Sequence, residues 1–292
     1  SGVEINKQSA NASKVLGRVL NSLADDFDMK LSTLSGGLKD NAIPTDAEAV
    51  VIFSDTDTSG INMPGHADIS SNSVYSSLQD LISKWNQIIR HEYTHTDPDI
   101  CITLEPVDLP AATMTDTSTH TVIDVLMTYP NGVRKMSKDI AGLVQTSLNL
   151  GILSTIKPDG QSTNGIVSFK SSVRSSIGSE KDALLNSLKS LATLAGGTLT
   201  VTGDYPAWEY REDSPLRDLM VKIFKQQYGK EPVIQALHAG VECGIFASKL
   251  PGLDCVSFGP DMDDIHTTNE SMNVESVRRT WEYTLEILKE LK

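Results

Sequence analysis

Apolar residues recur at helical or strand spacing along the first hundred residues and predict an order of secondary-structure elements. A helix is expected over residues 6–24, where apolar side chains return every three or four positions. The pattern then predicts strands over 29–34, 47–53 and 100–104, a polar loop over 55–73, and a helix over 74–89. Helices and strands thus mix within one stretch, which is typical of an α+β fold.

A similar order returns after residue 119. Helices are expected over 121–127, 137–143 and 180–194, and strands over 145–155, 165–172 and 198–202. The pair Gly196-Gly197 is expected to end the last of these helices. We therefore predict two copies of an α+β half, about 1–108 and 119–206, each an antiparallel sheet covered by helices. The polar stretch 110–119 would join them.

The character of the chain changes near Tyr205, where Pro206, Trp208 and Pro215 mark a boundary. Beyond it, helices are expected over 216–228, 242–248 and 274–291, with a short buried strand over 255–258. This tail is too small to form a whole enzyme domain, yet it carries several histidines and carboxylates. We therefore do not expect it to be a whole enzyme domain.

Charge and cysteine content narrow the class of protein. The formal net charge is -13 at pH 7, which argues against nucleic acid and against an anionic membrane as partners, because both bind basic surfaces. No apolar run approaches the about 20 residues of a membrane span. Three cysteines without a C-x-x-C pair indicate a reducing compartment. A cytoplasmic location is therefore expected.

Three short motifs gather near the end of the chain and carry its candidate chemistry. They are His238-Ala-Gly-Val-Glu-Cys-Gly244, Ser257-Phe-Gly-Pro260 and His266-Thr-Thr-Asn-Glu270. In order and spacing they resemble the C-terminal motifs of the aminoacyl-histidine dipeptidases, two-metal peptidases of the M20 group, also called Xaa-His dipeptidases or peptidase D. The resemblance implies a metal-dependent hydrolase that acts on dipeptides.

The resemblance also implies a domain organisation. In this family a lid domain interrupts an α/β catalytic domain. Residues 1–206 resemble the two-part lid, and residues 207–292 resemble the C-terminal segment of the zinc-peptidase catalytic domain. Ser1-Gly2 resembles the end of a G-G-H-S-G motif, and the first catalytic segment has no counterpart. The chain is therefore expected to be a fragment that is inactive alone.

By resemblance, His266 is the terminal histidine ligand of a pair of divalent metal ions, and zinc is the expected metal. A loop histidine without a ligand role is the alternative. His238 and Glu242 flank Gly240 on the rim of the implied substrate pocket, although the same residues would also suit a helix cap. Glu270 would orient the His266 loop, or remain a solvated carboxylate.

Two lid residues are implied to bind substrate. Asn41, in Gly36-Gly-Leu-Lys-Asp-Asn-Ala-Ile-Pro44, matches an asparagine that reaches into the active site. Arg174 matches an arginine that grips the C-terminal carboxylate of the substrate, for which a guanidinium fork is well suited. The alternatives are a turn residue for Asn41 and a surface strand residue for Arg174.

The stretch His91-Glu92-Tyr93-Thr94-His95 matches the H-E-x-x-H of zinc metalloproteases. That site needs both histidines on one face of a continuous helix. Here the apolar stripe ends at Ile89, and Pro98 follows, so the helix is expected to end near the second histidine. The metalloprotease interpretation is therefore disfavoured.

Hydrolysis of Xaa-His and related dipeptides by the parent protein is the function that these motifs favour. Two alternatives stay open at the level of sequence: another M20-type aminoacylase or carboxypeptidase, and a non-catalytic binding or dimerisation module. The sequence also leaves a homodimer open. The motif His238–Gly244 argues against the first alternative, because those relatives usually carry a Gly-Gly-Thr or Gly-Gly-Ser turn there.

Overall fold

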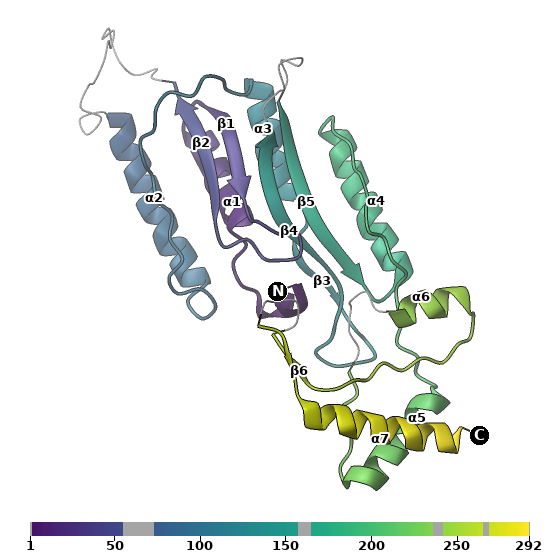
Figure 1. Ribbon diagram of the computed structural model, residues 1–292. Coiled ribbons are helices and arrows are strands. Elements are labelled where there is room, and N and C mark those ends of the chain that lie inside the picture. Colours follow the sequence, from purple (N-terminus) through teal and green to yellow (C-terminus); the bar gives the residue numbers. More distant parts are fainter. Residues whose placement is uncertain (1, 55–72, 157–164, 236–241, 265–268, 292) are drawn as a thin grey trace. The chain divides into compact units, whose positions relative to one another are not determined.

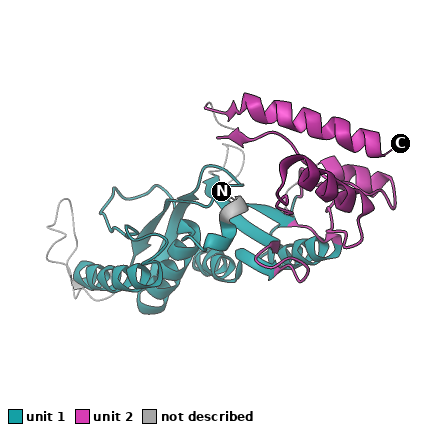
Figure 2. Cartoon of the chain, turned by 90° about the horizontal axis from the view of Figure 1, so that it is seen from below, with its two compact units in different colours: residues 1–135, 146–174, 179–200 teal, residues 136–145, 175–178, 201–292 magenta. Residues whose placement is uncertain are grey.

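The computed structural model describes residues 2–54, 73–156, 165–235, 242–264 and 269–291. The chain divides into two compact units (Figure 2). Unit 1 comprises residues 1–135, 146–174 and 179–200, and unit 2 comprises residues 136–145, 175–178 and 201–292. Each unit has a hydrophobic core of its own.

A five-stranded sheet forms the centre of unit 1. Its strands are β1 (Met29–Gly36), β2 (Ala47–Phe53), β3 (Gly132–Met136), β4 (Val144–Ile156) and β5 (Ile166–Ser175). They lie in the order β2-β1-β4-β3, and β5 also pairs with β4. Strands β1 and β2 are antiparallel, as are β1 and β4. Strand β4 is buried over most of its length, because it lies between its neighbours at the centre of the sheet.

Four long helices and one short helix accompany the sheet (Figure 1). They are η1 (Gly2–Lys7), α1 (Ala12–Asp26), α2 (Ser73–Glu92), α3 (Asp116–Thr128) and α4 (Gly178–Leu194). A single core joins apolar side chains of the four long helices to apolar side chains of β1, β4 and β5, among them Leu31, Leu148, Leu150 and Phe169. The long helices therefore cover the face of the sheet to which these side chains point.

Side chains stabilise the N-terminus of α1 and the C-terminus of α3. Asn11 caps α1, since its side-chain oxygen accepts from the Lys14 amide. The Lys14 ammonium donates to the carbonyls of Met127 (3.2 Å), Tyr129 (2.9 Å) and Leu126. These carbonyls lie at the C-terminus of α3, where a cation is favourable. Lys14 thus links α1 to the end of α3.

A pH dependence of stability is expected from Lys14. Burial lowers the pKa of its ammonium from 10.5 to about 8. Between these values the unfolded chain holds a proton that the folded protein has released, so the free energy of unfolding rises with pH. Between pH 7.5 and 10.5, the free energy of unfolding of the wild type should rise by at most about 3 kcal/mol more than that of Lys14→Met. Urea unfolding of both proteins across this range measures the difference; parallel curves would show that the carbonyls keep Lys14 charged.

Unit 2 is built around two packed helices. They are α5 (Pro215–Tyr228) and α7 (Val274–Glu290), accompanied by α6 (Glu242–Lys249) and the short strands β6 (Met262–Asp263) and β7 (Ser271–Met272). Met220, Ile223, Tyr283 and Ile287 form the core. The Tyr283 hydroxyl donates to the Met220 carbonyl at 2.7 Å, which satisfies the one polar group that this buried ring carries.

Most helices and strands lie where the apolar pattern predicts them, and β2, α2, α5 and α7 match within a few residues. The first helix begins later than expected, at Ala12, after the separate helix η1. Residues 137–143 form a turn rather than a helix, and β3 precedes them unpredicted. The loop expected over 55–73 falls almost wholly outside the described residues.

Three of the expected strands are absent from the described structure: 100–104, 198–202 and 255–258 have no regular secondary structure. The first of them has a clear cause. The Asn86 side chain donates to the carbonyl of Ile102 and accepts from its amide, both at 2.8 Å. One amide side chain therefore occupies the backbone groups that a neighbouring strand would need.

The expectation of one antiparallel sheet in each half is wrong. Strands from both halves join in a single sheet, because β1 of the first half pairs with β4 of the second. The mixed α and β character is as predicted. Among the described helices, none is long and apolar enough to cross a membrane.

Candidate substrate-binding face

Two of the six candidate site residues, His238 and His266, lie outside the described residues, but the strands that precede and follow His266 in the sequence are described. Strands β6 and β7 pair antiparallel, with Met262 opposite Met272. The Asn273 amide donates to the Asp261 carbonyl at 3.0 Å, and the Asp261 amide donates to Ser276 Oγ at 2.9 Å. These bonds tie the residue before β6 to the N-terminus of α7.

The two candidate glutamates of the tail, Glu242 and Glu270, are both exposed. Glu242 is the first residue of α6, where its carboxylate lies in the first turn and favours the positive end of the helix. This position suits the capping alternative as well as a site on a pocket rim. Glu270 directly precedes β7, four residues after His266 in the sequence.

Cys243 and Gly244 are the other residues of the His238–Gly244 motif that the structure describes. A Cβ atom at Gly244 would lie 2.8 Å from the Pro206 carbonyl oxygen, so only glycine lets α6 approach this segment. Burial and the neighbouring thiol of Cys255 raise the pKa of the Cys243 thiol. Cys243 is therefore not an activated nucleophile.

Arg174 extends from the face of the sheet opposite the helices. On β5, Val167, Phe169 and Val173 pack against the core, and alternation along a strand places Arg174 on the other face. The residue is half-buried. Among the residues that the structure describes, no carboxylate forms an ion pair with its guanidinium.

Asn41 lies on the same face as Arg174. On β4, Leu148 and Leu150 point into the core, so the side chain of Asn149 between them points to the opposite face. There it donates to the carbonyl oxygens of Asp40 and Ala42, at 3.2 and 2.7 Å. The sheet thus brings the loop of Asn41 and the side chain of Arg174 to one face.

The pairing of β4 with β5 shows how far Arg174 lies from Asn149 along the sheet. The Ser176 amide donates to the Gln145 carbonyl at 3.0 Å. Since the end of β5 therefore pairs with the start of β4, the two strands run antiparallel, and Arg174 lies opposite about residue 147. Asn149 is two residues further along β4, or roughly 7 Å. Arg174 and the Asn41 loop, which Asn149 contacts, therefore lie near each other on this face.

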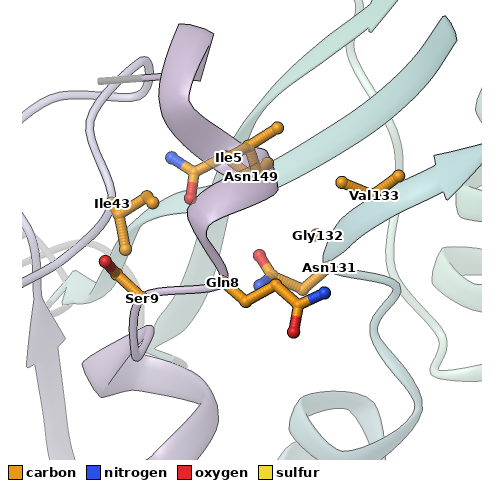
Figure 3. A pocket seen from close by; sticks show the side chains of 8 residues that line it. All are labelled: Ile5, Gln8, Ser9, Ile43, Asn131, Gly132, Val133 and Asn149. Carbon is orange, nitrogen blue, oxygen red and sulfur yellow. The ribbon is translucent and has the colours of Figure 1, made fainter. Parts of the chain in front are cut away.

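A cavity of about 280 Å³ lies beside Asn149, with Ile43 of the Asn41 loop in its wall. Figure 3 shows its lining: Ile5, Gln8, Ser9, Ile43, Asn131, Gly132, Val133 and Asn149. The Asn131 side-chain oxygen accepts from the Leu150 amide at 2.9 Å and from the Asn11 side chain at 3.3 Å. These amides connect the start of α1, the turn before β3 and strand β4, so their evident role is structural.

The H-E-x-x-H stretch is not a metal site of the metalloprotease type. Helix α2 ends at Glu92, so His91 and His95 do not share a continuous helix. Arg18 also binds Glu92 through two bonds, Nη1–Oε2 at 2.6 Å and Nη2–Oε1 at 2.8 Å. This pairing lowers the pKa of the Glu92 carboxyl, which opposes a role as general base.

No group of three or more His, Cys, Asp or Glu side chains that could hold a metal ion occurs within the described residues. Both candidate histidines of the tail lie outside that part of the chain. The described residues therefore do not form a metal site by themselves, and the arguments below rely on the substrate-binding face alone.

Sequence reasoning missed Asn149 and Gly151. A Cβ atom at Gly151 would lie 2.3 Å from the Asp40 carbonyl oxygen. Both residues hold the Asn41 loop, and both left a signal in the sequence. They interrupt the apolar stretch of β4, Leu148-Asn-Leu-Gly-Ile-Leu153, and a polar or Cβ-free residue in a buried strand indicates a specific partner on that face.

The sheet with its helices on one face and candidate carboxylate-binding groups on the other is consistent with the domain of a peptidase. Residues 25–290 match the family described as peptidase family M20/M25/M40. The chain therefore belongs to this family of peptidases. Peptidases of the family generally depend on divalent metal ions.

Two individual proteins make the comparison more specific. The cytosol non-specific dipeptidase of Escherichia coli (strain K12) is 32% identical over 291 residues, which cover 100% of this chain and 55% of that protein. The crystal structure of aminoacylhistidine dipeptidase from Vibrio alginolyticus is similar, with a TM-score of 0.81 and 30% sequence identity, over 96% of this chain and 52% of that one. The chain thus spans about half the length of these relatives.

Proposed function

We propose that the protein to which these residues belong hydrolyses dipeptides, with Xaa-His among its substrates. The observation that carries the proposal is the common face of Asn41 and Arg174, two polar groups suited to a free carboxylate. Both relatives named above are dipeptidases, which supports this substrate class over N-acyl amino acids.

In this proposal the chain supplies two parts of the enzyme. Residues 1–206 form the lid, whose halves are about 1–108 and 119–206, and residues 207–292 complete the catalytic domain. Asn41 and Arg174 bind the carboxylate of the substrate, and His238 and Glu242 lie at the rim of its pocket. Two divalent ions, with zinc as the expected metal and His266 as one ligand, would polarise the scissile carbonyl and activate water. Glu270 holds the His266 loop in place.

Carboxylate capture also explains selection by length. A longer peptide continues where the dipeptide carboxylate ends, so it offers no anion at the position of Arg174. The cytosolic relative and the sparse cysteines support a cytoplasmic location. Neither nucleic acid nor membrane is proposed as a partner, in keeping with the net charge of -13.

The test compares the rates at which the natural protein that contains this chain hydrolyses different substrates. We expect hydrolysis of Xaa-His dipeptides that is lost with a chelator and restored by Zn²⁺, and slow turnover of tripeptides and N-acetyl amino acids. Faster turnover of N-acetyl amino acids would favour the aminoacylase alternative. Absence of all turnover would favour a binding or dimerisation module.

A second test measures dipeptide hydrolysis by the 292-residue chain alone. One histidine loop cannot hold a metal pair, so no hydrolysis above the metal-only blank is expected in Zn²⁺, Co²⁺ or Mn²⁺. Turnover by this chain alone would contradict the division of the enzyme proposed above.

A further inference from the structure

The loop that carries Asn41 is held against strand β4 at several points. We define the Asn41 loop as residues 37–46. The Gly37 amide donates to the Asp46 carbonyl at 3.2 Å and closes the loop, and the Ala42 amide donates to the Lys39 carbonyl at 3.3 Å. The Ala12 amide, at the start of α1, donates to the Pro44 carbonyl at 3.1 Å. The loop therefore has a defined backbone path.

Asn149 fixes the part of this loop that matters most for Asn41. An asparagine amide has two N–H donors, and those of Asn149 go to the carbonyl oxygens of Asp40 and Ala42, the residues on either side of Asn41. Its own side-chain oxygen accepts from the side-chain amide of Asn11 at 3.4 Å. Asn149 is 2% exposed, so these bonds are shielded from bulk solvent.

Two glycines allow the close approach that these bonds require. A Cβ atom at Gly151 would lie within 2.6 Å of three backbone atoms of Asp40, and one at Gly37 would lie 2.0 Å from the Gly151 carbonyl oxygen. Gly37 also has a φ of +68°, a conformation that glycine adopts without strain. The loop and the strand therefore touch backbone to backbone beside Asn149.

The Asn41 side chain itself takes no part in this arrangement. It is exposed, and its amide makes no hydrogen bond to any of the residues that the structure describes. The protein thus uses a buried amide, two glycines and the start of a helix to fix the backbone on both sides of one exposed amide. Such an arrangement reduces the conformational freedom that Asn41 would lose on binding a ligand.

We infer that Asn149 is a positioning residue, which holds the Asp40 and Ala42 carbonyls so that Asn41 is presented to the carboxylate of a dipeptide. The inference rests on the proposed function of Asn41 as a substrate-binding residue. Asn149 itself does not touch the substrate: both of its donors are occupied by the loop.

The first experiment measures the loop without reference to activity. Amide hydrogen exchange is followed in the 292-residue chain for the wild type, Asn149→Ala and the control Asn131→Ala. Asn131 belongs to the same amide network but donates nothing to the Asn41 loop, since its oxygen accepts from Leu150 and Asn11. The Ala42 amide should exchange at least tenfold faster in Asn149→Ala and within about twofold of wild type in Asn131→Ala.

The second experiment measures dipeptide hydrolysis by the natural protein. Asn149→Ala should raise KM for a free dipeptide about tenfold with little change in kcat, as should Asn41→Ala. The double variant should be no worse than Asn41→Ala alone, because Asn149 acts only through Asn41. Gly151→Ala, whose Cβ displaces the same loop without altering any side-chain amide, should reproduce the effect, and it serves if Asn149→Ala does not fold.

The possible results separate this inference from the function on which it rests. Equal changes in Asn149→Ala and Asn131→Ala, or independent effects of Asn149→Ala and Asn41→Ala, would overturn the positioning role and leave the dipeptidase proposal intact. An unchanged KM in Asn41→Ala would overturn the substrate role of Asn41, and with it the positioning role of Asn149, whatever the exchange rates show.

Discussion

Replacing Arg174 by alanine should raise KM for free dipeptides about ten- to a hundredfold in the natural protein. A hydrogen bond between charged partners contributes roughly 1.5–3 kcal/mol to binding, which corresponds to this change in affinity. Arg174 lies on the face of the Asn41 loop, half-buried, and a desolvated guanidinium binds a carboxylate more strongly than an exposed one. The measurement is steady-state kinetics with a series of Xaa-His dipeptides.

Two controls distinguish a substrate contact from a structural role. A dipeptide amide has no carboxylate, so wild type and Arg174→Ala should process it equally. Lys170→Ala removes an exposed cation from the same face of β5, four residues or roughly 13 Å away, and should change KM less than twofold. Equal losses on acid and amide, or a lower melting temperature in place of a higher KM, would show that Arg174 is structural.

The largest effect on stability is expected at Leu126. Its side chain is fully buried at the contact of α3 with α1, where a Cβ atom added at Gly17 would lie only 3.0 Å from the Leu126 Cβ. The two helices are therefore too close to move further together and fill a void. Leu126→Ala should lower the free energy of unfolding by about 3–5 kcal/mol.

Its neighbour provides the matched control. Met127 is 42% exposed, so Met127→Ala should cost less than about 1 kcal/mol. Because the chain has two compact units, unfolding of unit 1 needs its own probe. Trp85 packs against the core of unit 1, and its fluorescence in urea, with Trp208 and Trp281 replaced by phenylalanine, reports on that unit. Similar losses in both variants would mean that the α1–α3 contact is not tightly packed.

The strand expected over 100–104 shows why an apolar pattern alone can mislead. Periodicity reports that a segment has an apolar face, but the partner that satisfies its backbone is set by the rest of the fold. Residues 100–104 alternate as a strand does, yet the Asn86 side chain binds their backbone. A register shift between Leu31 and Thr33 leaves both Leu31 and Leu34 buried on β1, which strict alternation would not allow.

The sequence alone determined the local elements and the family of the protein. Helices α2, α5 and α7 and strand β2 follow from apolar spacing, because a helix or strand with one buried face must repeat its apolar residues at 3.6 or 2 positions. The motifs His238–Gly244 and His266–Glu270 indicated the M20 peptidases, to which the chain belongs. Asn41 and Arg174 came from the same resemblance.

Only the tertiary structure decided how the strands combine and which residues support the candidate site. Strand β1 pairs with β4, more than a hundred residues later, and this pairing merges the two expected sheets into one. The bonds from Asn149 to Asp40 and Ala42 likewise cross more than a hundred residues. Strand pairing uses backbone groups that every residue carries, and the Asn149 bonds depend on one side chain and on the path of a distant loop. Neither kind of contact therefore leaves a periodic pattern in the sequence.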